Sequence, residues 1–159
     1  QLPFLNKDFL SYAKFASASL GELFGKSKLD DSQQKKVFEL RSTYFENTGN
    51  NIFERKELPR LVQASQIRQI VSDDLNNDGF LDLILMGNNY HISTQLGRLD
   101  AFHGMVLYND GKGTFENIEH LKVDGQVNAI EPITIRNKKG YLIGRNDDSP
   151  VFLTKNDSL

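Results

Sequence analysis

An internal repeat with a period near sixty residues constrains the fold of this chain more than any other feature. Residues 47–54 and residues 109–116 both read N-x-G-x-x-x-F-E. The phenylalanines of the two copies, Phe53 and Phe115, are 62 positions apart. Each copy follows an apolar or aromatic stretch and leads into another extended run. Each therefore predicts a β-hairpin in which Gly and Asn adopt the positive φ of the turn.

A second pair of similar segments supports the same period. Residues 66–70 match residues 126–130 at an offset of 60, and residues 83–88 match residues 141–146 at an offset of 58. Chance recurrence of Asn-Gly hairpins is the alternative, but two separate segments share nearly one offset. A unit of about sixty residues that holds about four short strands is typical of a propeller blade.

The repeat predicts how the chain is divided. Residues 67–121 form one full blade, residues 39–58 the end of the blade before it, and residues 127–155 the start of the blade after it. Propellers close with about four to eight blades. We therefore expect a mainly β chain, a partial β-propeller of about two blades of antiparallel four-stranded sheets, whose remaining N-terminal blades lie outside it.

Residues 1–38 predict a helical segment that is an insertion or a lead-in to the propeller. Asn6 is the predicted N-cap of a first helix, and Gly25 is placed to end it. A shorter helix is expected from Asp31 to Phe38, capped by Asp30 or Asp31. The apolar residues of the first helix recur at spacings of three and four, as one helical stripe requires: Phe9, Ala13, Ala16, Leu20, Leu23 and Phe24.

The segment from Asp74 to Asp82 carries the pattern most specific to a chemistry. Its sequence is D-L-N-N-D-G-F-L-D, with oxygen-bearing side chains at loop positions 1, 3, 5 and 9 and glycine at position 6. Three carboxylates, one amide and one carbonyl make an oxygen-only donor set. Such a set suits Ca²⁺ better than Mg²⁺. The predicted ligands of one structural Ca²⁺ are Asp74, Asn76, Asp78, the carbonyl of Phe80, and Asp82.

Two comparisons sharpen this prediction. An EF-hand requires Glu at position 12 and helices on both sides, whereas position 12 is Leu85 and the flanks are β-like. An acidic turn without metal remains the plain alternative. Where the loop would recur, residues 136–140 read R-N-K-K-G and contain no carboxylate. The next blade is therefore expected to keep its hairpin and to lack the ion.

The segment D-x-N-x-D-G-x-x-D-L between two apolar strands, followed by N-x-G-x-G-x-F, resembles an FG-GAP or VCBS repeat. Residues 86–90 and 95–104 also resemble the long inter-strand insertion of bacterial VCBS repeat proteins, which are widespread among Bacteroidetes. The resemblance implies calcium-bearing blades of an integrin-α-like propeller, export to the cell surface, and a binding or scaffolding role. Asn76 departs from the acidic residue common at its position.

Composition excludes several other classes of protein. The 159 residues include 19 Lys and Arg against 21 Asp and Glu, so the charge does not favour nucleic acid as a partner. Cysteine is absent, which excludes disulfides and thiolate zinc sites. No apolar run is long enough to span a bilayer. The chain starts at Gln1 without Met or signal sequence, and we expect it to be a processed or excised piece of a longer protein.

The insertion between residues 88 and 104 is the candidate binding loop, because long loops on a rigid sheet often carry function. Covering a sheet edge or the helical segment is an equally good explanation. His91, His103 and His120 lack metal-ligand spacing, and no nucleophile motif is present. The candidate contact residues are Tyr90, His91, Gln95, Arg98 and Phe102.

The predicted function is that of an exported, calcium-binding and non-enzymatic propeller module. It would serve protein–protein interaction or scaffolding at the cell surface, in the periplasm or as a secreted protein. Its partners would be other proteins, including the remaining blades, with glycan as a further candidate and no membrane insertion. The alternatives are a lectin-like carbohydrate binder and a propeller subunit of a secreted hydrolase or lyase.

Overall fold

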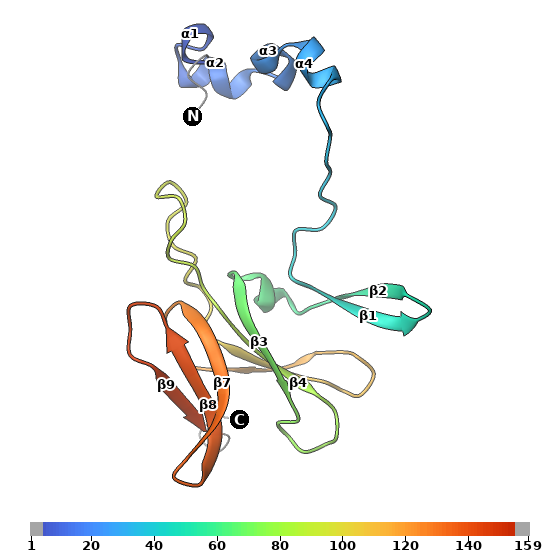
Figure 1. Cartoon of the computed structure of the whole chain (residues 1–159), viewed down its shortest axis with the longest axis vertical. Helices are drawn as coiled ribbons and strands as arrows, with labels where there is room; N and C mark the ends of the chain where they lie inside the picture. The colour runs from blue at the N-terminus through green and yellow to red at the C-terminus, as the bar shows by residue number, and fades with distance from the viewer. Residues whose placement is uncertain (1–4, 155–159) are drawn as a thin grey trace. The chain divides into compact units, whose positions relative to one another are not determined.

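The structure, a computed structural model, describes residues 5–154, and the chain divides after Leu40 into two units. In the described residues the first unit holds only short helices, and the second holds three antiparallel β-sheets (Figure 1). The chain is therefore mainly β.

The first unit contains short helices in place of the long helix that the apolar stripe predicts. The Ser11 side chain caps α2 by accepting from Lys14 N–H, and Ser19 and Glu22 form a capping box at α3. Serine side chains thus begin new helices inside the segment that the pattern reads as continuous, so the single-helix prediction is wrong. The helices are α1 (Leu5–Asp8), α2 (Tyr12–Ser17), α3 (Leu20–Phe24) and α4 (Lys26–Asp30).

The ends of the predicted first helix have mixed outcomes. Gly25 is the C-cap of α3 with φ of 81°, which confirms the glycine as a helix end. Asn6 lies inside α1 and is not an N-cap. Among the described residues, none of the helices has the length and apolar character that crossing a membrane requires.

The second predicted helix, residues 31–38, does not form. The helical structure ends with α4 at Asp30, and residues 33–40 have no regular secondary structure. Val37 and Phe38 are 73% and 90% exposed. A helix of about eight residues is marginal in water without an apolar face to bury, and no such burial occurs here.

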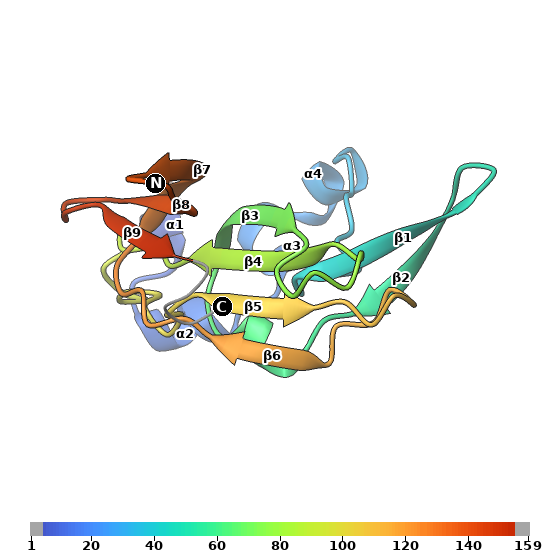
Figure 2. The same cartoon turned by 90° about the horizontal axis from the view of Figure 1, so that it is seen from below.

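The second unit consists of three antiparallel sheets, in the orders β1-β2, β3-β4-β5-β6 and β7-β8-β9. Figure 2 shows the four strands of the middle sheet side by side in chain order. A 3₁₀ turn, Arg60–Gln63, precedes β3. The strands are β1 (Thr43–Gly49), β2 (Ile52–Glu57), β3 (Ile67–Asp73), β4 (Asp82–Gly87), β5 (Met105–Tyr108), β6 (Asn117–His120), β7 (Val127–Ile135), β8 (Lys138–Arg145) and β9 (Val151–Thr154).

The middle sheet is buried on both of its faces. Strands β4 and β5 read as continuous apolar runs, which is typical of strands covered on two sides. Ile84, Met86 and Val106 belong to one core cluster, whereas the alternate residues Leu85 and Leu107 belong to another. Successive side chains of a strand point to opposite faces, so the two clusters lie on opposite sides of this sheet.

Each cluster joins the middle sheet to a different neighbour. The first cluster contains Val127, Ile130, Tyr141 and Ile143 of β7 and β8. The second contains Val62 of the 3₁₀ turn and Phe115, with Tyr44 of β1 packed against it. The Tyr44 and Phe115 rings meet edge to face at 5.6 Å. The middle sheet therefore shares one core with β7 and β8 and a second with the 3₁₀ turn and Tyr44, while most of β1 and β2 is exposed.

The two copies of the first repeated segment, residues 47–54 and 109–116, have the same local structure. The Asn47 side chain accepts from Gly49 N–H at 3.0 Å, and the Asn109 side chain accepts from Gly111 N–H at the same distance. Gly49 and Gly111 both have positive φ. The strands that flank each turn are paired antiparallel, so the two predicted hairpins are confirmed.

The other pair of repeated segments, around residues 66 and 126 and around residues 88 and 146, shares a backbone contact at the opposite end of the strands. Asn88 N–H donates to the Gln66 carbonyl at 3.0 Å, and Asn146 N–H donates to the Gln126 carbonyl at 2.8 Å. The pairing of β3 with β4 and that of β7 with β8 also shift register at the same place, directly after the first residue of β3 and of β7. Equivalent sequence positions thus make equivalent backbone contacts.

The β7–β8 turn differs from the β3–β4 turn as the sequence predicts. Arg136 and Asn137 form a two-residue turn with φ of 50° and 65°. Two residues with positive φ suit the twist of a tight hairpin. The hairpin is retained, and the long acidic loop of the preceding pair is replaced by this short basic turn.

Candidate functional site

The acidic segment is a loop between two paired strands. Residues 74–81 connect β3, which ends at Asp73, to β4, which begins at Asp82. Asp73 and Asp82 face each other as the last pair of the ladder. Strands on both sides confirm the strand–loop–strand prediction and exclude an EF-hand, which needs flanking helices.

Three of the predicted ligands are brought together inside the loop. The carboxylate of Asp74 accepts from Asp78 N–H at 3.1 Å and from Gly79 N–H at 3.0 Å. The Asn76 amide donates to the Asp78 carboxylate at 2.7 Å, and its oxygen accepts from Asp78 N–H at 3.0 Å. Gly79 has φ of 90°, the left-handed region that favours glycine. The Asn76 and Asp78 side chains therefore touch each other, while the Asp74 carboxylate accepts from backbone N–H groups of the same loop.

Asp82 anchors the loop from the first position of β4. Its side chain is fully buried, and its two oxygens accept from Leu75 N–H at 3.0 Å and from Asn109 N–H at 2.9 Å. The Asn109 side chain also donates to the Leu81 carbonyl at 3.2 Å. One carboxylate thus links the loop to the following hairpin. A carboxylate oxygen has more than one acceptor direction, so these bonds do not use up its capacity.

Phe80 joins the same two segments through its ring. Phe80 N–H donates to the Asp78 carboxylate at 2.8 Å, and the residue is 46% exposed. A Cβ atom added to Gly111 would lie 2.5 Å from Cζ of this ring. Glycine at position 111 therefore lets the ring rest on the hairpin backbone.

The donor chemistry of the loop fits Ca²⁺, because every predicted ligand offers an oxygen. Asp74, Asn76 and Asp78 lie close enough to share hydrogen bonds. Among residues 5–154, no group of three or more His, Cys, Asp or Glu side chains is arranged to hold a metal ion. The three carboxylates of the predicted set, those of Asp74, Asp78 and Asp82, therefore do not form such a group in this structure.

The candidate binding loop, residues 88–104, is held by backbone and side-chain bonds at its base. Asn89 and Leu99 form an isolated β-bridge, with N–H···O distances of 2.8 and 2.9 Å. Tyr90 N–H donates to the Gln126 side chain at 2.7 Å, which ties the loop to the start of β7. The Arg98 guanidinium lies 4.9 Å from the centre of the Tyr90 ring, a cation–π distance.

The other predicted contact residues of this loop have different surroundings. His91 Nε2 is 2.9 Å from the side-chain amide of Asn146, and Gln95 is exposed. Phe102 is 3% exposed and belongs to the core cluster with Leu85. The Phe102 backbone is held on both sides by the buried Asn88 side chain. Phe102 therefore packs in the core and does not offer its ring to a partner.

Two tyrosines near the acidic loop were not predicted as part of a site. Burial raises the pKa of Tyr108 to about 12, with a smaller contribution from its hydrogen bond to Glu119 and from nearby carboxylates that include Asp82. Burial also raises the pKa of Tyr141, whose hydroxyl donates to Asp73. That bond connects β8 to the residue directly before the loop. No sequence motif signals it, because the partners are 68 positions apart.

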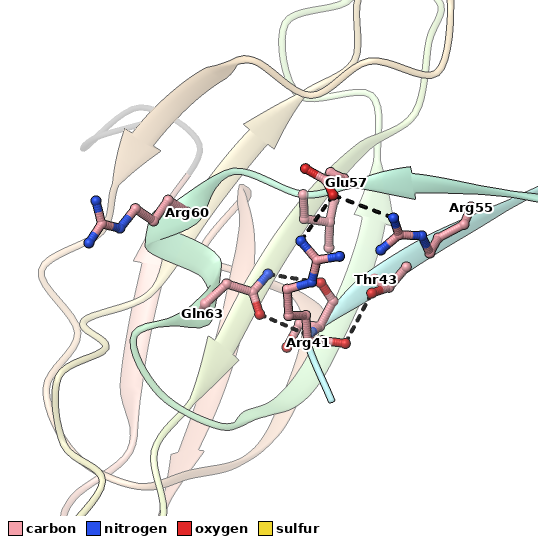
Figure 3. Close-up of a pocket in the computed structure, with 8 residues that line it drawn as sticks. Arg41, Thr43, Arg55, Glu57, Arg60 and Gln63 are labelled. Carbon is pink, nitrogen blue, oxygen red and sulfur yellow. Dashed lines mark hydrogen bonds and ion pairs between the residues drawn. The ribbon is translucent and has the colours of Figure 1, made fainter. Parts of the chain in front are cut away.

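A second feature missed by sequence reasoning is an arginine-rich depression of about 210 Å³ beside β1 and β2 (Figure 3). Its lining residues are separated along the chain, so no local pattern marks it. They are Arg41, Ser42, Thr43, Arg55, Glu57, Leu58, Arg60 and Gln63.

Comparisons of the chain with protein-family models, with curated proteins and with solved structures found no match.

Proposed function

We propose that this chain is a calcium-binding module of a β-propeller that acts through protein–protein contacts outside the cytoplasm. The loop between β3 and β4 carries the proposal, because hydrogen bonds draw the oxygen-bearing side chains of Asp74, Asn76 and Asp78 into one short turn. The role is scaffolding or binding, with no reaction assigned.

Three features support the propeller part of the proposal. The middle sheet is a four-stranded antiparallel meander, the strand order expected of a blade. Its two faces carry separate cores, one shared with β7 and β8 and the other with Tyr44 of β1. The sheet β7-β8-β9 repeats the turn contact and the register shift of the middle sheet at an offset near sixty.

The same repeat suggests a place for the N-terminal unit. In the middle sheet, the insertion of residues 88–104 separates the second strand, β4, from the third, β5. Residues 47–54 correspond to residues 109–116, so β1 and β2 correspond to the third and fourth strands of a blade. Residues up to 42 then occupy the chain position of the same insertion, in the blade before.

The chemistry of the loop supports calcium as a structural ion. Asp74, Asn76, Asp78, the Phe80 carbonyl and Asp82 would hold it, and bound Ca²⁺ would offset the repulsion among three carboxylates. Asp82 accepts hydrogen bonds from Leu75 in the loop and from Asn109 in the next hairpin, so ordering of the loop by Ca²⁺ would also stabilise that hairpin. An extracytoplasmic location would expose the loop to calcium at the concentrations that fill extracellular sites, whose dissociation constants are about 10⁻⁴–10⁻³ M.

The test compares thermal unfolding in excess calcium and in chelator. Calcium at about 100-fold over its dissociation constant would stabilise the chain by about 2.7 kcal/mol. Asp78→Asn keeps an oxygen to accept Phe80 N–H but removes a charge. We expect this variant to lose the difference between calcium and chelator.

The control variant is Asp100→Ala, which removes an exposed carboxylate outside the acidic loop. It should keep the full response to calcium. Magnesium at the same concentration should stabilise the wild type less, because Mg²⁺ gives up its water reluctantly. A wild-type chain that melts at one temperature in calcium and in chelator would refute the calcium part of the proposal.

A further inference from the structure

The hairpin of β1 and β2 exposes apolar side chains whose counterparts in the repeat are buried. At the offset of 62, Phe45 corresponds to Leu107 in β5, and Phe53 corresponds to Phe115. Leu107 and Phe115 are 0% and 8% exposed, whereas Phe45 and Phe53 are 54% and 60% exposed. Equivalent positions are therefore covered in the middle sheet and open in the sheet β1-β2.

The two sheets also differ in how many neighbours the equivalent strand has. Strand β5 pairs with β4 along one edge and with β6 along the other. Within residues 5–154, β1 pairs with β2 alone. Since β2 corresponds to β6, the open edge of β1 is the one that β4 occupies on β5. The N–H and C=O groups along an open edge can pair with a further strand.

The strand on that edge of β5 contributes to the core in which Leu107 lies. Leu85 of β4 belongs to the same core cluster as Leu107, and Leu83 of β4 packs against that cluster. Strand β3 adds Ile67 to it. Because β3 and β4 are paired and joined by the acidic loop, one hairpin supplies all three side chains. A hairpin of the same kind would cover the open side of β1.

The pairing of β4 with β5 also gives the register for such a strand. Leu83 lies opposite Leu107, and Leu85 lies opposite Met105. The offset of 62 places Phe45 at the position of Leu107 and Thr43 at that of Met105. A strand that joined β1 in the same register would place its equivalent of Leu83 opposite Phe45 and its equivalent of Leu85 opposite Thr43.

A second copy of this chain does not offer its own β4 for this role. That strand is already paired on both edges, with β3 and with β5. A copy could use it only by opening its middle sheet, in which Ile84, Leu85 and Met86 are almost fully buried. The occupant is therefore a separate hairpin of the same type, as the preceding blade of a propeller would supply.

We propose that the open edge of β1 is the docking site of a β-hairpin of the β3–β4 type, contributed by the preceding blade. Its second strand pairs antiparallel with β1 and covers Phe45, with the equivalent of Leu85 opposite Thr43. This inference rests on the propeller part of the proposed function and does not depend on calcium in the acidic loop of this chain.

The experiment uses disulfide trapping, because the chain contains no cysteine of its own. The full chain with Thr43→Cys is mixed with a blocked peptide of residues 66–89 that carries either Leu85→Cys or Leu83→Cys. Cβ atoms directly opposite lie about 4.5–5.5 Å apart, and diagonal ones on the same face are farther apart, while a disulfide needs about 3.5–4.5 Å. We expect mass spectrometry to show Leu85→Cys trapped about tenfold faster than Leu83→Cys.

Binding of the labelled wild-type peptide tests the apolar contact. Phe45→Ser should weaken it about tenfold, since it removes one large apolar side chain from the interface. Phe45→Leu, which installs the residue found at position 107, should bind as the wild type does and keeps the test valid if Phe45→Ser lowers the melting temperature. The matched control is Tyr12→Ser, which removes an aromatic residue that is 94% exposed in α2 and should leave binding unchanged.

Three results would overturn the docking site. They are equal trapping of the two cysteine peptides, no binding of the peptide, and a dimer of the chain alone in which the β1 amides are protected from hydrogen exchange, since that dimer would assign the edge to a second copy. The thermal response to calcium, measured on the same chain, keeps the two proposals apart. A chain that responds to calcium but does not bind the peptide contradicts only the docking site, and the reverse contradicts only the calcium site.

Discussion

Single residues around the acidic loop have two separate tasks. Asp74, Asn76 and Asp78 lie within the loop and are linked mainly to one another and to loop N–H groups. Asp82 is fully buried and satisfies two backbone donors from different segments. Its removal should therefore affect the folded chain even where calcium is absent.

Asp82→Ala should lower the free energy of unfolding by about 3 kcal/mol in calcium and in chelator alike. The substitution leaves the N–H groups of Leu75 and Asn109 without their acceptor in a buried place, and each orphaned donor costs about 1–3 kcal/mol. Urea unfolding followed by circular dichroism measures the loss. Equal stability of the variant and the wild type in chelator would contradict this role of Asp82.

Tyr108 predicts a loss of stability at high pH. Its pKa is raised to about 12 from the ordinary 10, chiefly by burial. The unfolded chain therefore releases this proton first as pH rises. The contribution is fully present below pH 10 and is lost as pH approaches 12. In a series of melts above pH 9, Tyr108→Phe should fall less steeply than the wild type, and parallel curves would contradict the prediction.

At the scale of elements, the acidic loop and the hairpin after β5 work as a connected pair. Asn109 supplies two hydrogen bonds from the hairpin, and Gly111 supports the Phe80 ring. Sequence reasoning predicted both turns from their local residues. Their mutual contact was not predictable, because it depends on how β3, β4 and β5 align in the sheet.

Gly111→Ala should destabilise the chain by about 1–3 kcal/mol, since its Cβ would lie 2.5 Å from the Phe80 ring and its φ is 77°. Phe80→Ala removes the clash but not the backbone strain. The double variant should therefore be more stable than the sum of the two single losses predicts. Chemical denaturation of all four proteins measures this coupling, and strict additivity would show that ring and glycine do not touch.

The insertion of residues 88–104 contains both core and surface positions. Phe102 is 3% exposed, whereas Leu96 is 77% exposed. Phe102→Ala should lower the unfolding free energy by about 3–5 kcal/mol, and Leu96→Ala should change it by less than about 0.5 kcal/mol. Thermal melts of both variants measure the contrast, and comparable losses would contradict the burial seen here.

At the scale of the whole molecule, the second unit holds three antiparallel sheets and the first is a set of short helices. The segment that joins them is exposed and without regular structure over residues 33–40. Lys35 and Lys36 lie in it. Trypsin should therefore cut first after these lysines, and the product beginning at residue 37 should keep the β signature in circular dichroism. Mass spectrometry identifies the first cut, and cleavage within β1 or β2 beforehand would contradict this division.

The local chemistry of the sequence was enough to predict the hairpins and the strand–loop–strand segment that holds Asp74, Asn76 and Asp78. Turn residues and strand alternation act over a few positions, so their effects can be read from neighbouring residues. The tertiary structure decided the rest. It broke the apolar stripe of the N-terminal segment into capped short helices, placed Phe102 in a core, joined Asp82 to Asn109, and brought Arg41 and Arg55 to the same oxygen of Glu57. Those outcomes depend on which distant segments pack together, and a local sequence pattern does not specify its long-range packing partners.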